Sequence, residues 1–208
     1  MKDPLDFTGK VALVTGSSRG IGAEMIKAFG TRGAQCVVNY VADAQGQNKA
    51  DALGVAKELN EPLVIECDVT QPQQVEAMMK QIQDQRGGLD ILVNNSGVIS
   101  DRTIKKMSLD EFESVIRVNL IGTFTVTQKA AAILRNGGRV INMSSVSGQM
   151  GLFGQANYSS SKAGNYCAHQ SFSTRVCAAE HNRERHCAWI HRCRNEQRHA
   201  GGSDAELH

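Results

Sequence analysis

The chain of 208 residues carries 23 basic and 21 acidic side chains, so its formal net charge is only +2. That length suits a single domain with a sizeable hydrophobic core. The balanced charge excludes a strong electrostatic case for nucleic acid or a membrane surface as partner. Because the sequence shows neither a membrane-spanning apolar run nor a signal peptide, we expect a cytoplasmic protein with no membrane or nucleic-acid partner.

The first expected element is a short β-branched strand at residues 10–15, followed at once by a glycine-rich turn and a helical pattern. Strand, glycine turn and helix in this order are typical of a dinucleotide-binding unit. Gly16 allows the tight turn, Gly20 lets the backbone approach a pyrophosphate, and Gly22 lets the helix pack closely on the strand. The helix N-terminus then offers free N–H groups to the phosphates. A purely structural glycine turn is the alternative.

Strands and helices continue to alternate along the chain. Strands are expected at residues 35–39, 63–67, 89–93 and 139–143, and helices at 47–59, 73–85 and about 109–134. This alternation predicts an α/β fold, with a Rossmann-like, doubly wound parallel sheet and helices on both faces. We find no linker, second domain or repeat before residue 164.

Tyr158 and Lys162 are four residues apart, so on a helix they share one face, one turn apart. A lysine ammonium beside a phenol favours the phenolate, and such a tyrosine can exchange a proton with a substrate near neutral pH. Ser145, thirteen residues before Tyr158, follows an apolar run and could bring a hydroxyl to the same place. The alternative is a surface helix with an extended lysine.

With these motifs in order, the chain resembles the short-chain dehydrogenase/reductase family over roughly residues 7–164. The resemblance is carried by Thr15-Gly16-x-x-x-Gly20-Ile21-Gly22, Asp68-Val69, Asn94-Asn95-Ser96-Gly97, Asn119, Ser145 and Tyr158-x-x-x-Lys162. Residues 15–19, 118–122 and 154–158 are most similar to bacterial 3-oxoacyl-acyl-carrier-protein reductases within that family. Ser96 stands where the family more often has alanine, a small change that we expect to be harmless.

The resemblance implies a catalytic set of Asn119, Ser145, Tyr158 and Lys162. Tyr158 would donate a proton to the carbonyl oxygen of a substrate, and Ser145 would hydrogen-bond that oxygen. Lys162 would favour the tyrosinate and hold the nicotinamide ribose. Asn119, expected within the long helix, would hold a water that relays protons toward Lys162; an ordinary helical asparagine is the alternative.

The cofactor expected from these residues is NADP(H). An NAD enzyme usually has an acidic residue at the end of the second strand, but here that strand ends at Asn39 and the first carboxylate is Asp43. Arg19 in the glycine loop can meet a 2′-phosphate. Asp68 would face the adenine, or alternatively cap the strand end, and Asn94 and Gly97 would line the adenosine and nicotinamide side. The full set expected to bind cofactor is Gly16, Ser18, Arg19, Gly20, Ile21, Gly22, Asn39, Asp68, Val69, Asn95, Gly97, Tyr158 and Lys162.

The sequence changes character after Gly164. Residues 165–208 hold all six histidines, four of the six cysteines and the single tryptophan, without apolar periodicity. Back-translating from Asn165 and dropping one base gives a frame that matches what the family would carry next. We therefore predict a dinucleotide-binding domain at 1–164 and a non-homologous, frameshifted tail at 165–208, with the last strands missing or scrambled.

A metal module is the alternative for this tail. Cys187, His191 and Cys193 lie close together in sequence, with His181 and His186 nearby, but no Cys-x-x-Cys pair occurs there. We therefore expect no metal site.

The function expected from the resemblance is NADPH-dependent reduction of a carbonyl to an alcohol, with a 3-oxoacyl-[acyl-carrier-protein] of fatty acid synthesis as substrate. Alternative substrates are other ketones, quinones or sugars, and the non-enzymatic alternative is a catalytically dead nucleotide-binding product. The resemblance also implies a homotetramer built partly through the two long helices. A chain ending in the tail described above would be destabilised and inactive.

Overall fold

A computed structural model describes Asp3 and residues 5–176 of the chain, with side chains through residue 168. The candidate metal-module residues from His181 to Cys193 lie outside the described residues, as does most of the tail. The strands are β1 (Val11–Val14), β2 (Gln35–Tyr40), β3 (Leu63–Glu66), β4 (Leu89–Asn94) and β5 (Leu134–Asn142). The helices are α1 (Gly20–Gly30), α2 (Gln47–Ala56), α3 (Pro72–Arg86), α4 (Leu109–Ile116), the π-helical segment η1 (Arg117–Gly122), α5 (Thr123–Ala130), α6 (Ser147–Met150) and α7 (Ala156–Val176).

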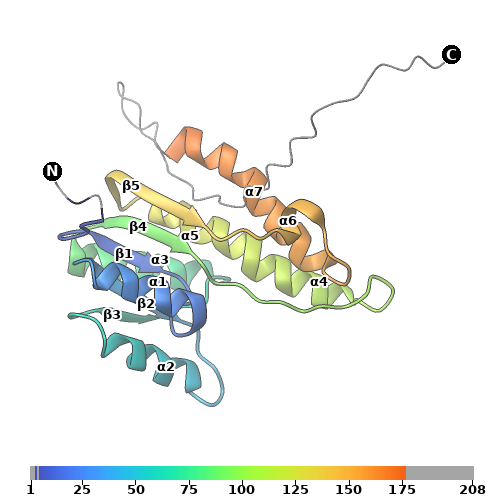
Figure 1. The fold of residues 1–208 in the computed structure, drawn as a ribbon, viewed down its shortest axis with the longest axis horizontal. Coiled ribbons are helices and arrows are strands. Elements are labelled where there is room, and N and C mark those ends of the chain that lie inside the picture. Colours follow the sequence, from blue (N-terminus) through green and yellow to red (C-terminus); the bar gives the residue numbers. More distant parts are fainter. Residues whose placement is uncertain (1–2, 4, 177–208) are drawn as a thin grey trace.

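The five strands form one parallel sheet in the order β3-β2-β1-β4-β5 (Figure 1). The order reverses direction at β1, since β2 and β3 extend to one side of it and β4 and β5 to the other. In such sheets, ligands bind beyond the carboxyl ends of the strands, at the point where the order reverses. The predicted Rossmann-like fold is therefore confirmed, and it puts a candidate site beside the carboxyl ends of β1 and β4.

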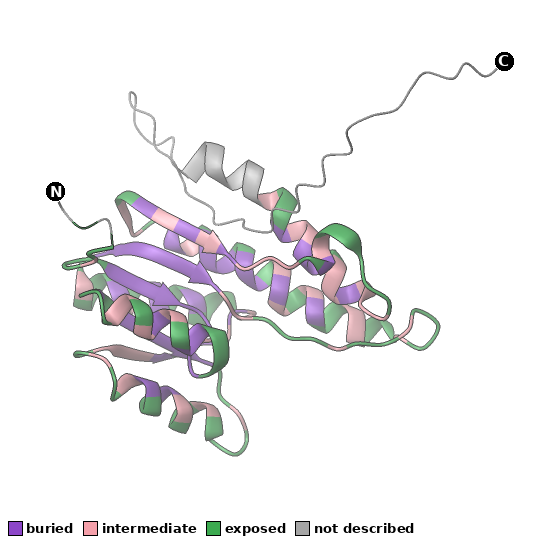
Figure 2. Cartoon of the chain, in the orientation of Figure 1, coloured by how far each residue is buried: buried purple, intermediate pink, exposed green. Residues whose placement is uncertain are grey.

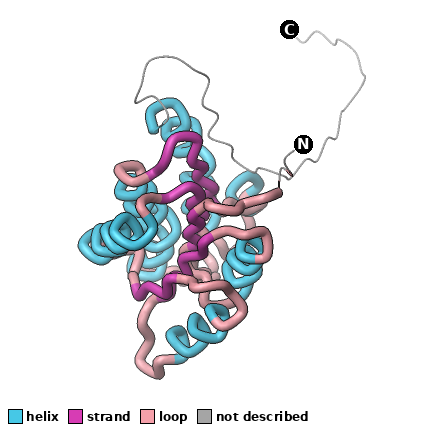
Figure 3. Tube along the Cα trace, turned by 90° about the vertical axis from the view of Figure 1, so that its left-hand side faces the viewer, coloured by secondary structure: helices cyan, strands magenta, loops and turns pink. Residues whose placement is uncertain are grey.

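Helices cover both faces of the sheet, as the edge-on view shows (Figure 3). Alternate residues of β1 divide between the two faces: Val11 and Leu13 pack in one core, and Ala12 and Val14 in the other. The first core also receives side chains of α3 and α5, and the second receives those of α1 and α2. The central strands are buried on both sides, which parallel strands require (Figure 2).

The long helix predicted over residues 109–134 forms one unbroken helical run, but it is not α-helical throughout. It is divided into α4, the π-helical η1 and α5, and it ends at Ala130. β5 then begins at Leu134 rather than at the predicted residue 139, because Leu134 pairs with Leu89. The register shifts before Arg139 pairs with Ile91, so a bulge separates two paired parts of one strand. Local periodicity could not show that distant pairing.

Helix α7 continues past Gly164 to Val176, so residue 164 marks no break in secondary structure. The frameshifted origin of the following residues stays a prediction. In the described part of the chain, β5 is the last strand of the sheet on its side. Beside it, between β4, β5 and α1, lies an apolar hollow of about 390 Å³ whose lining includes Phe29, Val93 and Ile141.

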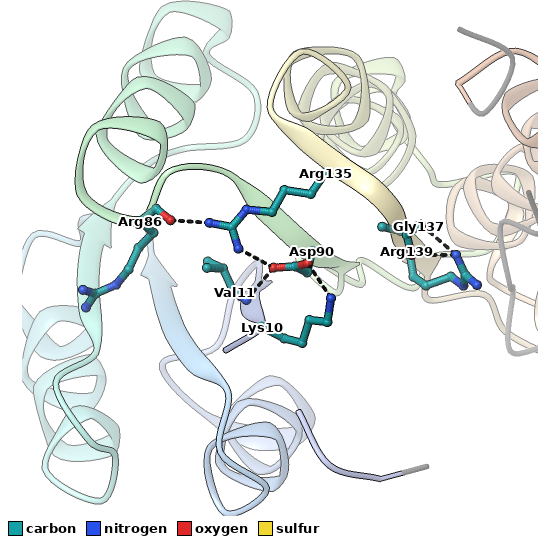
Figure 4. Close-up of polar contacts among 8 residues, drawn as sticks. Lys10, Val11, Arg86, Asp90, Arg135, Gly137 and Arg139 are labelled. Carbon is teal, nitrogen blue, oxygen red and sulfur yellow. Dashed lines mark hydrogen bonds and ion pairs between the residues drawn. The ribbon is translucent and has the colours of Figure 1, made fainter. Parts of the chain in front are cut away.

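The amino-terminal edge of the sheet is held together by the carboxylate of Asp90, at the start of β4 (Figure 4). Asp90 is 5% exposed and accepts hydrogen bonds from Val11 N (2.9 Å), Lys10 Nζ (3.1 Å) and Arg135 Nη1 (2.7 Å). Burial alone raises the pKa of Asp90, but the Val11 N–H and the two cations outweigh it, so the pKa lies below its ordinary value. One buried charge thus joins β1, β4 and the start of β5.

Candidate active site

The candidate site lies at the carboxyl edge of the sheet, where three strands end beside one another. β1 leads into the glycine loop, β4 into Asn95 and Gly97, and β5 into Ser145. Helix α7 brings Tyr158 and Lys162 to the same edge, because Lys162 Nζ donates a 2.7 Å hydrogen bond to the carbonyl oxygen of Met143, just after β5. The parallel sheet therefore gathers motifs that are far apart in the sequence.

The glycine loop has the form that a pyrophosphate site requires. At the N-terminus of α1 no side chain caps the helix and no acidic residue occupies the first turn. A Cβ on Gly20, where φ is +57°, would meet nothing within 4 Å, so the backbone there lies open. A Cβ on Gly22 would lie 2.5 Å from both Gly16 O and Asn95 Nδ2, so the close approach of helix to loop requires glycine. Free N–H groups and an unopposed dipole fit a bound phosphate.

Hydrogen bonds from the side chains of Asn39 and Asn95 hold the glycine loop in place. Asn39 is 1% exposed; its Oδ1 accepts a hydrogen bond from Gly16 N (2.9 Å), and its Nδ2 donates to Cys67 O (3.1 Å). Asn95 Nδ2 donates to Thr15 O (2.9 Å). The expectation that Asn39 contacts the cofactor directly needs correction, because its side chain points inward and acts through the loop.

The remaining residues expected at the cofactor differ in their accessibility. Ile21 is 68% exposed at the mouth of the loop, whereas Ser18 and Val69 are buried. Asp68 Oδ1 accepts hydrogen bonds from the N–H and the hydroxyl of Thr70, as the strand-end cap would require. Gly97 lies against Asn119, since a Cβ added there would be 3.3 Å from Asn119 Oδ1.

Asn94, by contrast, does not line the dinucleotide side. Its Nδ2 donates to Thr127 Oγ1 of α5 (2.9 Å) and to Asn142 Oδ1 at the end of β5 (2.6 Å). The side chain thus joins β4, β5 and α5 inside the protein.

Tyr158 and Lys162 lie one turn apart on α7, as the spacing predicts. Lys162 Nζ is 5.6 Å from the centre of the Tyr158 ring. Lys162 is only 5% exposed, and this burial lowers its pKa from 10.5 to about 8. The site therefore holds a lysine that titrates close to physiological pH beside a phenol, as proton-transfer chemistry needs.

Ser145 belongs to a chain of hydrogen bonds that the sequence did not suggest. Its hydroxyl donates to Ser147 Oγ (3.3 Å), which donates to Gln155 Oε1 (2.9 Å). Gln155 Nε2 in turn donates to Asp101 Oδ2 (3.0 Å). Because a carboxylate can only accept, Asp101 fixes the direction of every donor in the chain. Ser145 is thereby tied to the loop that precedes α4.

Asn119 lies in η1 with its side chain already bonded to protein. Its Oδ1 accepts from Val98 N (2.8 Å), and its Nδ2 donates to Val98 O (2.9 Å) and to Ser161 Oγ (3.2 Å). Its carbonyl oxygen accepts from Thr123 Oγ1 (2.9 Å) and from Asn165 Nδ2 (2.8 Å). Asn165 therefore competes with the predicted water for a hydrogen bond to Asn119, and no sequence pattern had pointed to Asn165.

The fold and the arrangement of this site are those of the α/β class to which dinucleotide-binding proteins belong. The family model for "short chain dehydrogenase" matches residues 10–184. This chain therefore belongs to the short-chain dehydrogenase family.

Relatives with assigned activities are similar across most of this chain. A 3-oxoacyl-[acyl-carrier-protein] reductase of Synechocystis is 39% identical over 162 residues, which cover 76% of this chain and 64% of that protein. The reductase of the same name from Escherichia coli is 36% identical, covering 77% and 64%. This chain thus spans slightly less than two thirds of the length of these relatives.

Solved structures agree with this assignment. A short-chain dehydrogenase from Mycobacterium avium aligns with a TM-score of 0.75 and 32% identity, covering 82% of this chain and 66% of the other. One from Burkholderia cenocepacia, solved in complex with NADP, aligns with a TM-score of 0.74 and 30% identity, covering 81% and 69%.

Proposed function

We propose that this chain binds NADP(H) and reduces a carbonyl group to an alcohol, with a 3-oxoacyl thioester on acyl carrier protein as substrate. The predicted frameshift gives the opposite expectation, an inactive chain, and turnover by the full chain decides between the two. The observation that carries the proposal is the buried Lys162 beside the ring of Tyr158, at the edge of the sheet where the glycine loop opens. The relatives that share most of this chain are reductases of that name, which supports the choice of substrate.

The dinucleotide, when bound, supplies the hydride for the carbonyl carbon. The glycine loop and the N-terminus of α1 would hold its pyrophosphate. Tyr158 gives its phenolic proton to the carbonyl oxygen, and Ser145 turns its hydroxyl from Ser147 toward that oxygen. Lys162, fixed by its bond to Met143 O, places a positive charge near the phenol as the proton leaves.

The choice of NADP(H) over NAD(H) is supported by the environment of Asp43. Both oxygens of this carboxylate accept N–H groups at the start of α2, from Gln47 (3.1 Å) and Asn48 (2.7 Å). Asp43 therefore holds the backbone at the start of α2, where the N-cap residue is Gly46, and both of its oxygens are already hydrogen-bonded. Arg19 places a cation at the same edge of the sheet, where a 2′-phosphate could bind it in exchange for Asp51.

The decisive test measures NADPH binding and NADPH oxidation separately on the full chain. Substrates should include an acetoacetyl thioester of acyl carrier protein, a free ketone, a quinone and a sugar. Oxidation with the thioester alone supports the proposal, and oxidation with another carbonyl supports reduction of other ketones, quinones or sugars. Binding without turnover leaves a nucleotide-binding protein, and absence of binding overturns the proposal.

Cytoplasmic location and assembly as a homotetramer also remain proposals. Ile121 of η1 is 51% exposed and Phe124 of α5 is 45% exposed, which supports a self-association surface on these helices. Within the residues that the structure describes, no helix could span a membrane.

A further inference from the structure

The guanidinium of Arg19 reaches from the glycine loop to helix α2. It forms an ion pair with Asp51 Oδ2 at 3.1 Å and donates a hydrogen bond to Asn48 Oδ1. The Arg19 side chain is 56% exposed and that of Asp51 is 29% exposed. The cation expected to meet a 2′-phosphate is thus already paired within the protein.

The partners of Arg19 are themselves held in position. Gln47 Nε2 donates a 2.6 Å hydrogen bond to Asp51 Oδ1, so this carboxylate is oriented from its own helix. Asn48 Nδ2 donates to Val41 O (2.9 Å), just after β2. Arg19 therefore faces two acceptor oxygens, of Asn48 and Asp51, that other hydrogen bonds hold in position at the start of α2.

Both contacts of Arg19 with α2 use its Nη2, so a 2′-phosphate that bound this nitrogen would have to displace Asp51. The phosphate carries close to two negative charges near neutral pH and competes for the same N–H donors as the carboxylate. A nearby carboxylate also repels it directly. NAD(H) has no phosphate at this position, so its binding requires no exchange of partners at Arg19.

We propose that Asp51 is a specificity-determining residue that competes with the 2′-phosphate for Arg19 and so restrains the preference for NADPH over NADH. This inference rests on the proposed function and extends it to a residue outside the glycine loop. The alternative is the opposite effect on NADPH affinity, in which Asp51 improves NADPH binding by orienting Arg19.

The test measures the Kd of NADPH and of NADH by nucleotide fluorescence on the full chain and on D51N. The asparagine keeps an acceptor oxygen for Gln47, removes the charge and places an amide NH2 where the second oxygen faces Arg19. We expect D51N to bind NADPH about threefold to tenfold more tightly at low salt, with less than about a twofold change for NADH. The gain should shrink at high salt, because this pair is solvent-exposed. The double variant R19A/D51N should bind NADPH no more tightly than R19A alone.

The matched control is D84N, which removes the same charge from an exposed ion pair with Lys80 on α3. It should leave both Kd values unchanged. An unchanged ratio of the two affinities in D51N, or weaker NADPH binding, overturns the competition. A wild-type chain that binds neither nucleotide overturns the proposed function itself, whereas binding with an unresponsive ratio overturns only the role of Asp51.

Discussion

The two edges of the same sheet use polar groups in opposite ways. At the amino-terminal edge, the buried carboxylate of Asp90 is fully engaged by Val11 N, Lys10 and Arg135. At the carboxyl edge, Lys162 is equally buried but donates a hydrogen bond to a backbone carbonyl, and no carboxylate in the described part of the chain forms an ion pair with it. The same degree of burial therefore lowers the pKa of Lys162, toward its neutral form, while Asp90 is kept charged.

We relate this difference to two roles, stability at the amino-terminal edge and proton transfer at the carboxyl edge. A buried charge with several partners fixes the strands that supply those partners. A buried charge without a counter-ion is held close to its titration point, where it can respond to a substrate. We therefore expect substitutions at the two edges to affect different measurements.

The largest effect is expected for Tyr158→Phe, which removes the proposed proton donor and keeps the ring. Reductase activity should fall by about 10²- to 10⁴-fold, because general acid catalysis supplies a factor of that size. NADPH affinity and the thermal transition should change little. Tyr166→Phe, two turns further along α7, is the matched control. An equal loss of activity in that variant would contradict the proposed role of Tyr158 as proton donor.

At the opposite edge, Asp90→Ala should lower stability and spare the chemistry per folded molecule. Leaving the Val11 N–H and the facing cations without their acceptor should cost about 1–3 kcal/mol of unfolding free energy. Urea titration measures this loss, with Asp84→Ala at an exposed position of α3 as control. The contradictory result would be a lost activity at unchanged stability.

The decrease in unfolding free energy at acid pH should depend on the same carboxylate, Asp90. The folded pKa of Asp90 lies below its unfolded value of about 3.9, so its contribution is present above that pH. This contribution is lost as the pH falls through the folded pKa. In Asp90→Asn the unfolding free energy should therefore depend less steeply on pH in the acid range.

Lys162 should make activity and stability change in opposite directions with pH. Its pKa is about 8 when folded and 10.5 otherwise, so activity that needs the charged lysine should decline as the pH rises through about 8. Over the same range the folded state sheds a proton that the unfolded chain keeps, so this residue contributes increasing stability. Parallel pH profiles of kcat and unfolding check this; a kcat that is constant from pH 7 to about 9 contradicts it.

The smallest effect is expected at Asn165, which is 2% exposed and has a buried Oδ1 with no hydrogen-bond partner. The frame obtained by dropping one base would place isoleucine here, beside Leu120 and Ala168. Asn165→Ile removes the orphaned oxygen but also the bond to Asn119 O, so we expect a gain of up to about 1 kcal/mol. A lower Tm in both Asn165→Ile and the smaller Asn165→Val would show that the asparagine stabilises this helix.

Much of this protein could be predicted from local pattern. The strand, glycine turn and helix from residue 10 onward, the alternation that gives a parallel sheet, and the shared face of Tyr158 and Lys162 depend on neighbours within a few residues. The corrections concern distant partners. The pairing of Leu134 with Leu89 brings β5 forward, and the inward turn of Asn39 depends on Gly16 and Cys67.

The sequence by itself determined which elements form and which residue types gather at the carboxyl edge, because periodicity and backbone preference act over short distances. Only the tertiary structure decided whether each polar side chain faces a ligand or another part of the protein. Arg19 finds its partners 29 and 32 residues away on α2, and Asn119 is met by Asn165, 46 residues away. Such pairings arise because folding requires buried polar groups to find partners, and the sheet brings distant candidates together.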